Sequence, residues 1–306
     1  MAMMRLSRAL TALVVLGWAQ LAHAGELRHE VFASSILGRE MPLTVYVPDG
    51  YETSRQSYPV LYLLHGAGGD QNSWAERGHI KETADALIKS GDVPPTLIVM
   101  PGCPGCWWVD GAKDRAETAF WDELVPIVAK RYRTITTRDG QLVAGLSAGG
   151  YGAVRFALKY ADRLAAVAAF SPAVYATTPP PASAARSQPP FLGPDGQFDQ
   201  AAWTAQNYPR FTEHYFGQPM RVPMYLVSGD NDAFGIAFET ALLFKTIYER
   251  QPKLAELRIV DGDHTWAVWS NAVGDAMKYM YQFASRPVVA TAPSQQSGPM
   301  VAAKPR

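Results

Sequence analysis

The sequence has few cysteines, no excess of charge and, after its first two dozen residues, no long apolar run. Only two of the 306 residues are cysteine, which is too few for a disulfide-built mini-protein or for a zinc site with four cysteine ligands. Lys and Arg number 28, as do Asp and Glu, so binding of nucleic acid through phosphate neutralisation is not expected. With 48 % hydrophobic residues, the chain is typical of a globular protein with one large core.

The first 24 residues have the features of a secretory signal. Arg5 and Arg8 precede a mostly apolar run over 9–21, and Ala22-His23-Ala24 matches an A-x-A cleavage site. The alternative, a membrane anchor, needs about 20 apolar residues and is disfavoured. We therefore expect cleavage after Ala24, no membrane insertion of the mature protein and a periplasmic or secreted location.

Export bears on the two cysteines, Cys103 and Cys106, which enclose a Pro-Gly pair. In an oxidising compartment they can close as a local disulfide across a tight turn. A redox-active motif would instead require a helix N-terminus in a thioredoxin-like unit, whereas this pair follows an apolar run typical of a strand. We expect a structural disulfide.

Short apolar runs alternate with amphipathic stretches of helical length. The runs cover 60–64, 97–100, 142–144, 165–170, 224–227 and 257–260, and the helical stretches cover 73–89, 116–131, 148–160, 237–250 and 269–283. Two earlier segments, 29–36 and 42–47, alternate as in an antiparallel hairpin. Because continuous apolar strands suit a sheet that is covered on both faces, the pattern predicts an α/β architecture over residues 25–286. Its mostly parallel, eight-stranded sheet carries helices on both faces.

Two segments depart from this alternation. Residues 171–221 form a long connection that is rich in proline and aromatic residues, and long connections in compact domains are often functional covers. We expect a partly helical lid over a site. Residues 287–306 are rich in Pro, Ala, Ser and Gln without periodicity, which predicts a disordered tail.

A nucleophile motif lies between a predicted strand and a predicted helix. Gly145-Leu146-Ser147-Ala148-Gly149 follows the run 142–144 and opens the helical stretch 148–160. This G-x-S-x-G pattern places a serine on a sharp strand-to-helix turn, where flanking glycines allow close backbone approach. Ser147 is therefore the candidate nucleophile.

Serine needs a base, and the six histidines leave one good candidate. His264 directly follows the last predicted strand, where the base belongs in a Ser…Asp…His chain order. His65 stands in the Gly-rich turn after 60–64, and there it is expected to fix the loop rather than to accept a proton. The N–H groups of Ala67, in that turn, and of Ala148 could form an oxyanion hole.

The orienting acid is expected after the run 224–227, where Asp230 and Asp232 both occur. A buried carboxylate would hold the imidazole in its working tautomer, and the residues alone favour neither aspartate. A calcium loop does not fit, because Phe234 and Ala241 stand at ligand positions. The pattern indicates no metal or cofactor.

Taken together, these motifs resemble the esterase D branch of the α/β hydrolases, over roughly residues 43–283. That branch includes S-formylglutathione hydrolases, feruloyl and acetyl-xylan esterases, and mycolyltransferases. The matching elements are Leu64 to Gly69 with Trp74, Gly145 to Gly150, Gly229 to Asp232, and His264 to Trp266 with Trp269. In the family's G-x-x-D motif the last residue is the acid, so the resemblance implies Asp232. It also implies that Ala67 donates to the oxyanion.

The expectation is an exported serine esterase that acts on a small-molecule or polysaccharide-linked ester. The resemblance leaves open an acyltransferase that uses the same triad, and a non-catalytic binding protein is the remaining alternative. Trp107 and Trp108 are candidates for an apolar wall against the substrate, and core packing is an equally good interpretation of them. The acyl and alcohol groups of the substrate are not predicted.

Overall fold

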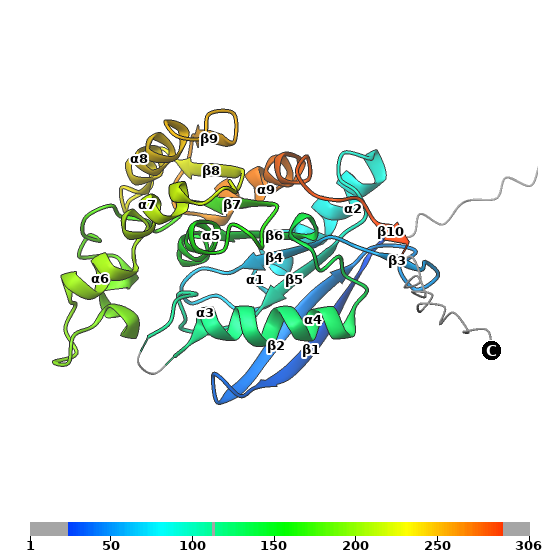
Figure 1. The fold of residues 1–306 in the computed structure, drawn as a ribbon, viewed down its shortest axis with the longest axis horizontal. Helices are drawn as coiled ribbons and strands as arrows, with labels where there is room; N and C mark the ends of the chain where they lie inside the picture. The colour runs from blue at the N-terminus through cyan, green and yellow to red at the C-terminus, as the bar shows by residue number, and fades with distance from the viewer. Residues whose placement is uncertain (1–23, 112–113, 290–306) are drawn as a thin grey trace, which may run out of the picture.

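An eight-stranded sheet crosses the computed structural model, which describes residues 24–111 and 114–289 (Figure 1). Its strand order is β1-β2-β5-β4-β6-β7-β8-β9. The bounds are β1 (Glu26–Ser34), β2 (Arg39–Val47), β4 (Val60–Leu64), β5 (Leu97–Pro101), β6 (Gln141–Leu146), β7 (Ala166–Phe170), β8 (Met224–Gly229) and β9 (Ala255–Val260). The β1–β2 hairpin is antiparallel and β2 runs antiparallel to β5. From β5 to β9 neighbouring strands are parallel. The predicted α/β-hydrolase fold is confirmed.

Strand β4 shows why continuous apolar runs form this sheet. Tyr62 and Leu64 belong to the hydrophobic cluster on one face, whereas Leu61 and Leu63 belong to the cluster on the other. Successive side chains of a strand point to opposite faces, so a strand with helices on both sides must be apolar at every position.

Helices cover both faces of the sheet (Figure 1). Those packed on the Tyr62 face are α3 (Ala116–Ala119), α4 (Val125–Arg131), α5 (Ala148–Lys159) and α8 (Ile236–Tyr248). Those on the Leu61 face are α2 (Ile80–Ser90) and α9 (Trp266–Met280). A single π-helical turn, Phe120–Leu124, joins α3 to α4, so the predicted stretch 116–131 is helical throughout.

One predicted helix is interrupted. The stretch 73–89 divides into α1 (Ser73–Glu76) and α2, because the chain turns at Gly78 and at His79, whose φ is 50°. A Cβ on Gly78 would lie 2.6 Å from Cε3 of Trp74, so close packing against the indole requires glycine here. The prediction of one continuous helix was wrong at this point.

The long connection 171–221, which was predicted to be a lid, packs closely against the domain and is called the cover below. It contains two short 3₁₀ turns, Ala184–Ser187 and Pro189–Phe191, and the helices α6 (Gln200–Gln206) and α7 (Pro209–Gly217). Its aromatic side chains Phe191, Trp203 and Tyr215 are fully buried in the main core. The segment is therefore held against the domain by its own apolar residues.

The two ends of the chain bear on two earlier predictions. The predicted signal lies outside the described residues except for Ala24. The predicted disordered tail is contradicted at its start, because β10 (Val288–Val289) pairs antiparallel with β3 (Gln56–Ser57). The rest of that segment, 290–306, also lies outside the described residues.

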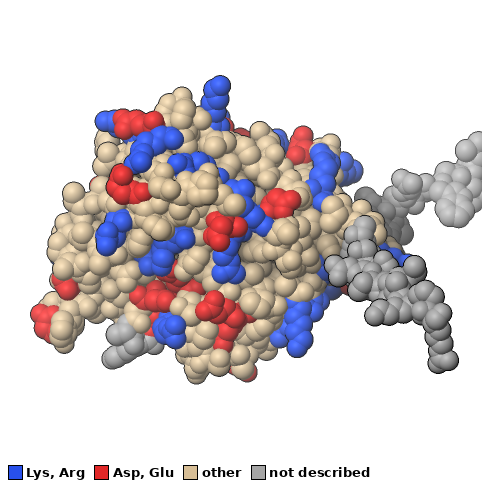
Figure 2. All heavy atoms as spheres, in the orientation of Figure 1, with Lys and Arg blue, Asp and Glu red and all other residues tan. Residues whose placement is uncertain are grey.

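The charge distribution is mixed on the face shown in Figure 2, where Lys and Arg are interspersed with Asp and Glu. This matches the equal numbers of cationic and anionic residues in the sequence. Within residues 24–111 and 114–289, no helix combines the length and the apolar character needed to cross a bilayer.

Candidate active site

Ser147 occupies the sharp turn between β6 and α5. Its φ of 52° and ψ of −114° lie outside the regions that L-residues ordinarily adopt, and its N–H donates to the Phe170 carbonyl at 2.8 Å. A Cβ on Gly145 would lie 2.4 Å from the Gly149 carbonyl oxygen, and one on Gly149 would lie 2.6 Å from that of Leu64. The flanking glycines are needed because the backbones approach so closely, and the strained turn presents the hydroxyl at the end of the sheet.

His264 brings this hydroxyl into a hydrogen-bonded chain. Its Nε2 lies 3.0 Å from Oγ of Ser147, and its Nδ1 lies 2.6 Å from Oδ2 of Asp232. The imidazole is in edge-to-face contact with Phe234 and Trp269, at centroid distances of 5.1 and 5.0 Å. The loops after three different strands thus bring a hydroxyl, an imidazole and a carboxylate into one hydrogen-bonded chain.

Asp232 and Asp230 occupy different environments although they share one loop. The Asp232 side chain is fully buried, and its second oxygen, Oδ1, accepts the N–H of Phe234 at 3.0 Å. Asp230 is exposed, and its Oδ1 accepts the Gly262 N–H at 3.1 Å. Asp230 therefore ties the two loops together, and Asp232 is the carboxylate that reaches His264.

The two candidate oxyanion donors are close to Ser147, since Ala67 lines the same cavities and Ala148 is the next residue in the chain. Ala148 is the first residue of α5, so its N–H has no acceptor within the helix. Ala67 follows β4 in the Gly-rich turn, and in the part of the chain that the structure describes its N–H donates to no backbone or side-chain acceptor. Both groups are free to receive a developing negative charge.

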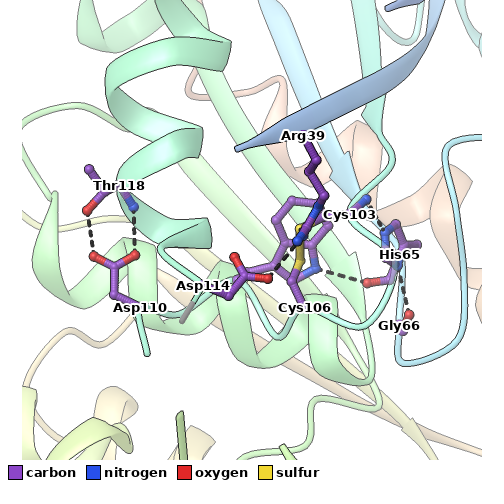
Figure 3. The surroundings of a disulfide bond; sticks show 9 residues. Arg39, His65, Gly66, Cys103, Cys106, Asp110, Asp114 and Thr118 are labelled. Atoms are coloured by element: carbon purple, nitrogen blue, oxygen red, sulfur yellow. Dashed lines mark hydrogen bonds and ion pairs between the residues drawn. A yellow bond between two sulfur atoms is a disulfide. The ribbon is translucent and has the colours of Figure 1, made fainter. Parts of the chain in front are cut away.

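His65 fixes the Ala67 turn from behind. The ring Nδ1 lies 2.8 Å from the Gly66 carbonyl, and Nε2 accepts the Cys103 N–H at 3.0 Å (Figure 3). Burial lowers the pKa of this imidazole. A neutral ring whose Nε2 lone pair is already occupied cannot serve as a base, in agreement with the structural role expected for it.

The loop after β5 closes with a disulfide between Cys103 and Cys106 (Figure 3). The turn between them is tight, since the Cys106 N–H donates to the Cys103 carbonyl at 3.1 Å. Because His65 bonds to the Cys103 N–H, the disulfide loop and the Ala67 turn support each other.

The two tryptophans after the disulfide have different roles. Trp107 lines a cavity beside Ser147 and packs against Tyr151 and Phe191. Trp108 is fully buried, donates its indole N–H to the His65 carbonyl at 3.1 Å, and lines neither of the two cavities beside Ser147 that are described below. The interpretation of Trp108 as a substrate wall was therefore wrong, because its ring is buried in the core and its indole N–H is bonded to the His65 carbonyl.

Two cavities meet at Ser147 and His264. The first, called the polar cavity because it is the more polar of the two, has a volume of about 260 Å³ and is lined by Gly66 to Gly69, Ser73, Arg77, Leu146, Thr265, Trp266 and Trp269. The second, of about 170 Å³, is mostly apolar and is lined by Trp107, Ala173, Tyr175, Ser183, Ala184, Phe234 and Ile236. Ala67 borders both cavities. An ester with its carbonyl at Ser147 could therefore extend one arm into each.

Sequence reasoning did not single out several of these wall residues. Tyr175, Ser183 and Ala184 come from the cover, and the Tyr175 carbonyl accepts the side-chain amide of Asn207, which precedes α7. Arg77 follows the short helix α1. Their position in the sequence could have identified them, because all of them follow the carboxyl end of β4 or β7, and binding sites of parallel sheets form at these ends. No three His, Cys, Asp or Glu side chains among the described residues are grouped as metal ligands.

The family comparison agrees with this geometry. Residues 34–280 match the model of the Esterase family. Over 150 residues the chain is 34 % identical to Esterase Rv1288 of Mycobacterium tuberculosis. This alignment covers 46 % of this chain and 31 % of the relative. The chain is 31 % identical over 139 residues to an endo-1,4-beta-xylanase/feruloyl esterase of Xylanibacter ruminicola, covering 41 % of this chain and 19 % of the other. The matched region thus spans a third or less of these longer relatives.

Solved structures share the fold over most of the chain. A ferulic acid esterase aligns with a TM-score of 0.73 and 25 % identity, covering 85 % of this chain and 99 % of the other. An S-formylglutathione hydrolase from Agrobacterium tumefaciens aligns with a TM-score of 0.68 and 22 % identity, covering 86 % and 96 %. Together with the family match over most of its length, this establishes that the chain belongs to the Esterase family, in the esterase D-like branch of the α/β hydrolases.

Proposed function

We propose that this chain hydrolyses carboxylic esters through an acyl-enzyme on Ser147. The observation that carries the proposal is the continuous hydrogen-bond chain from Asp232 through His264 to the Ser147 hydroxyl. A serine hydroxyl is a weak nucleophile until an adjacent base accepts its proton. Membership of the Esterase family supports the same chemistry.

In the first half-reaction, Oγ of Ser147 bonds to the ester carbonyl carbon while Nε2 of His264 takes the hydroxyl proton. The carbonyl π electrons move to oxygen, and the N–H groups of Ala67 and Ala148 donate to the resulting oxyanion. When this intermediate collapses, the bond to the alcohol oxygen breaks and His264 gives that oxygen its proton. Asp232 stabilises the imidazolium throughout without taking the proton itself.

In the second half-reaction, water replaces the alcohol. His264 removes a proton from the water as its oxygen bonds to the acyl carbon, and the same two N–H groups hold the second oxyanion. Collapse breaks the bond to Oγ, which recovers its proton from His264. The products are a carboxylic acid and free Ser147.

The two cavities suggest which arm of the ester goes where. The apolar cavity, walled by Trp107, Tyr175 and Phe234, suits the acyl group, because burying apolar surface is favourable there. Its volume of about 170 Å³ is close to the roughly 150 Å³ of a protein cavity known to hold benzene. A short chain or one aromatic ring therefore fits, in agreement with relatives that are named feruloyl esterase. The alcohol then occupies the polar cavity.

A panel of p-nitrophenyl esters tests the proposal. We expect kcat/KM to be high for acetyl, butyryl and benzoyl esters and to fall at least tenfold for dodecanoyl. Trp107→Ala, which enlarges the acyl cavity, is expected to move the preference toward the longer chains. Tyr248→Ala, at an exposed position of α8, serves as the matched control and should keep the wild-type order.

Two results would contradict the proposal. The first is no hydrolysis of any ester together with no labelling of Ser147 by a fluorophosphonate, which is the behaviour of a binding protein. The second is an acylated sugar, rather than free acid, as the main product when a sugar acceptor is added, which is the behaviour of an acyltransferase.

We also infer that the chain is exported, with its mature N-terminus at Gly25. The disulfide between Cys103 and Cys106 supports this, because such bonds persist in oxidising compartments. Mass spectrometry of protein from the periplasm or medium is the test, and a product that keeps residues 1–24 would contradict the inference.

A further inference from the structure

The polar cavity beside Ser147 has an unbalanced charge. Arg77 is the one Lys or Arg side chain in its wall, and neither Asp nor Glu lines it. Asp70 follows the Gly-rich turn, but its Oδ1 already accepts the Ser73 hydroxyl at 2.9 Å and the Asn72 N–H at 3.0 Å. The wall therefore presents a cation without a facing carboxylate.

Arg77 rests on an aromatic support. Its Cζ lies 5.1 Å from the ring centroid of Trp266, which is within the range of a cation–π contact. Trp266 is in edge-to-face contact with Trp74 and Trp269 at 5.2 and 5.4 Å, and the Trp74 indole N–H donates to the Leu64 carbonyl at 3.0 Å. A cluster of indole rings in edge-to-face contact thus holds the guanidinium at the cavity wall.

Arg77 also has free hydrogen-bonding capacity. Within residues 24–111 and 114–289 its side chain forms no ion pair and no hydrogen bond, and the residue is exposed. A guanidinium presents several N–H donors in one plane, which match the two oxygens of a carboxylate. A carboxylate on a bound molecule would therefore give Arg77 the anionic partner that the described part of the protein does not supply.

We propose that Arg77 selects esters whose alcohol portion carries a carboxylate. This inference rests on the proposed function and on the alcohol occupying the polar cavity. The carboxylate lies against Arg77 while the ester carbonyl lies at Ser147, so the interaction acts on recognition rather than on bond breaking. Arg77 is accordingly a specificity residue and takes no part in proton transfer.

A matched pair of substrates tests the proposal. 3-Acetoxybenzoate and 3-acetoxybenzamide have the same acyl group and nearly the same shape, and only the first is an anion at neutral pH. The measured quantity is the ratio of their kcat/KM values, compared between wild type and Arg77→Gln, so that intrinsic differences in leaving group cancel. We expect the ratio to fall about fivefold in the variant at low ionic strength, near the upper effect of an exposed ion pair, and to fall less in high salt.

Two variants serve as controls. Arg77→Lys keeps the charge and should keep much of the preference, although an ammonium lacks the planar fork. Arg210→Gln removes an exposed arginine from α7, and this variant should behave as wild type with both esters.

Three results would overturn the inference. An unchanged ratio in Arg77→Gln shows that the cation does not sense the substrate. If kcat/KM instead falls by the same factor for both esters, Arg77 only supports Trp266. The third result concerns the position of the charge, which the phenyl half-ester of adipate places in the acyl portion and its amide removes. If the Arg77-dependent preference for the anion appears only with this second pair, the acyl and alcohol portions occupy the opposite cavities. If wild type hydrolyses none of these esters and is not labelled at Ser147, the proposed function itself has failed.

Discussion

Replacing Ser147 with alanine is expected to lower kcat by about 10⁴- to 10⁶-fold, the range seen when a catalytic serine of a triad is removed. His264→Ala should cost a similar factor, because without a base at 3.0 Å from Oγ the hydroxyl stays protonated and unreactive. The double variant should lose little more than either single variant, since the two groups act as one unit. The measurement is steady-state hydrolysis of p-nitrophenyl acetate, with fluorophosphonate labelling as a second readout.

Matched controls separate this effect from misfolding. Ser187→Ala and His214→Ala change exposed residues of the cover and should keep wild-type rates. Thermal unfolding of the Ser147→Ala protein should be close to wild type, because only one half-buried hydroxyl and its hydrogen bond with His264 are lost. Losses of Ser147 and His264 that multiply in the double variant would show that the two residues act independently and would contradict the mechanism.

Asp232→Asn is expected to lower kcat/KM by about 10³- to 10⁴-fold, whereas Asp230→Asn should lower it less than tenfold. In the first variant the amide oxygen can still accept the Phe234 N–H, which turns the NH₂ group toward His264. The imidazole Nδ1 must then accept a hydrogen bond, so the ring proton moves to Nε2 and the base faces Ser147 in the wrong tautomer.

Asp230→Asn keeps the oxygen that accepts the Gly262 N–H, so the two loops stay joined. The pair is a matched comparison, because the same chemical change is made two residues apart in one loop. A larger loss in Asp230→Asn than in Asp232→Asn would show that the wrong acid has been assigned. Comparing kcat/KM for one activated ester in both variants is sufficient.

The main elements could be predicted because their signals are local. The strand Val60–Leu64 is apolar at each position, and that pattern alone indicates a strand buried on both faces. Ser147 follows such a strand, Gln141–Leu146, whereas His264 follows the partly exposed edge strand Ala255–Val260. The carboxyl ends of parallel strands meet at one edge of the sheet. Their proximity could therefore be anticipated although they are 117 residues apart.

Other features depend on contacts that no local pattern encodes. The break between α1 and α2 follows from the approach of Trp74 to Gly78. Val288–Val289 pair with Gln56–Ser57, a strand partner from the far end of the chain, within a segment whose composition predicted disorder. The start of α9 at Trp266, three residues before the predicted 269, brings the helix close behind His264.

The amino-acid sequence by itself determined the α/β fold, the candidate nucleophile and the candidate base, because periodicity and the glycine-flanked turn act over a few neighbouring residues. The tertiary structure decided which of two aspartates reaches His264 and which of two adjacent tryptophans faces a cavity. It also brought Arg77 into the wall beside Ser147. The two aspartates, like the two tryptophans, are close in sequence, so the paths of loops from different strands determine which of each pair reaches the site.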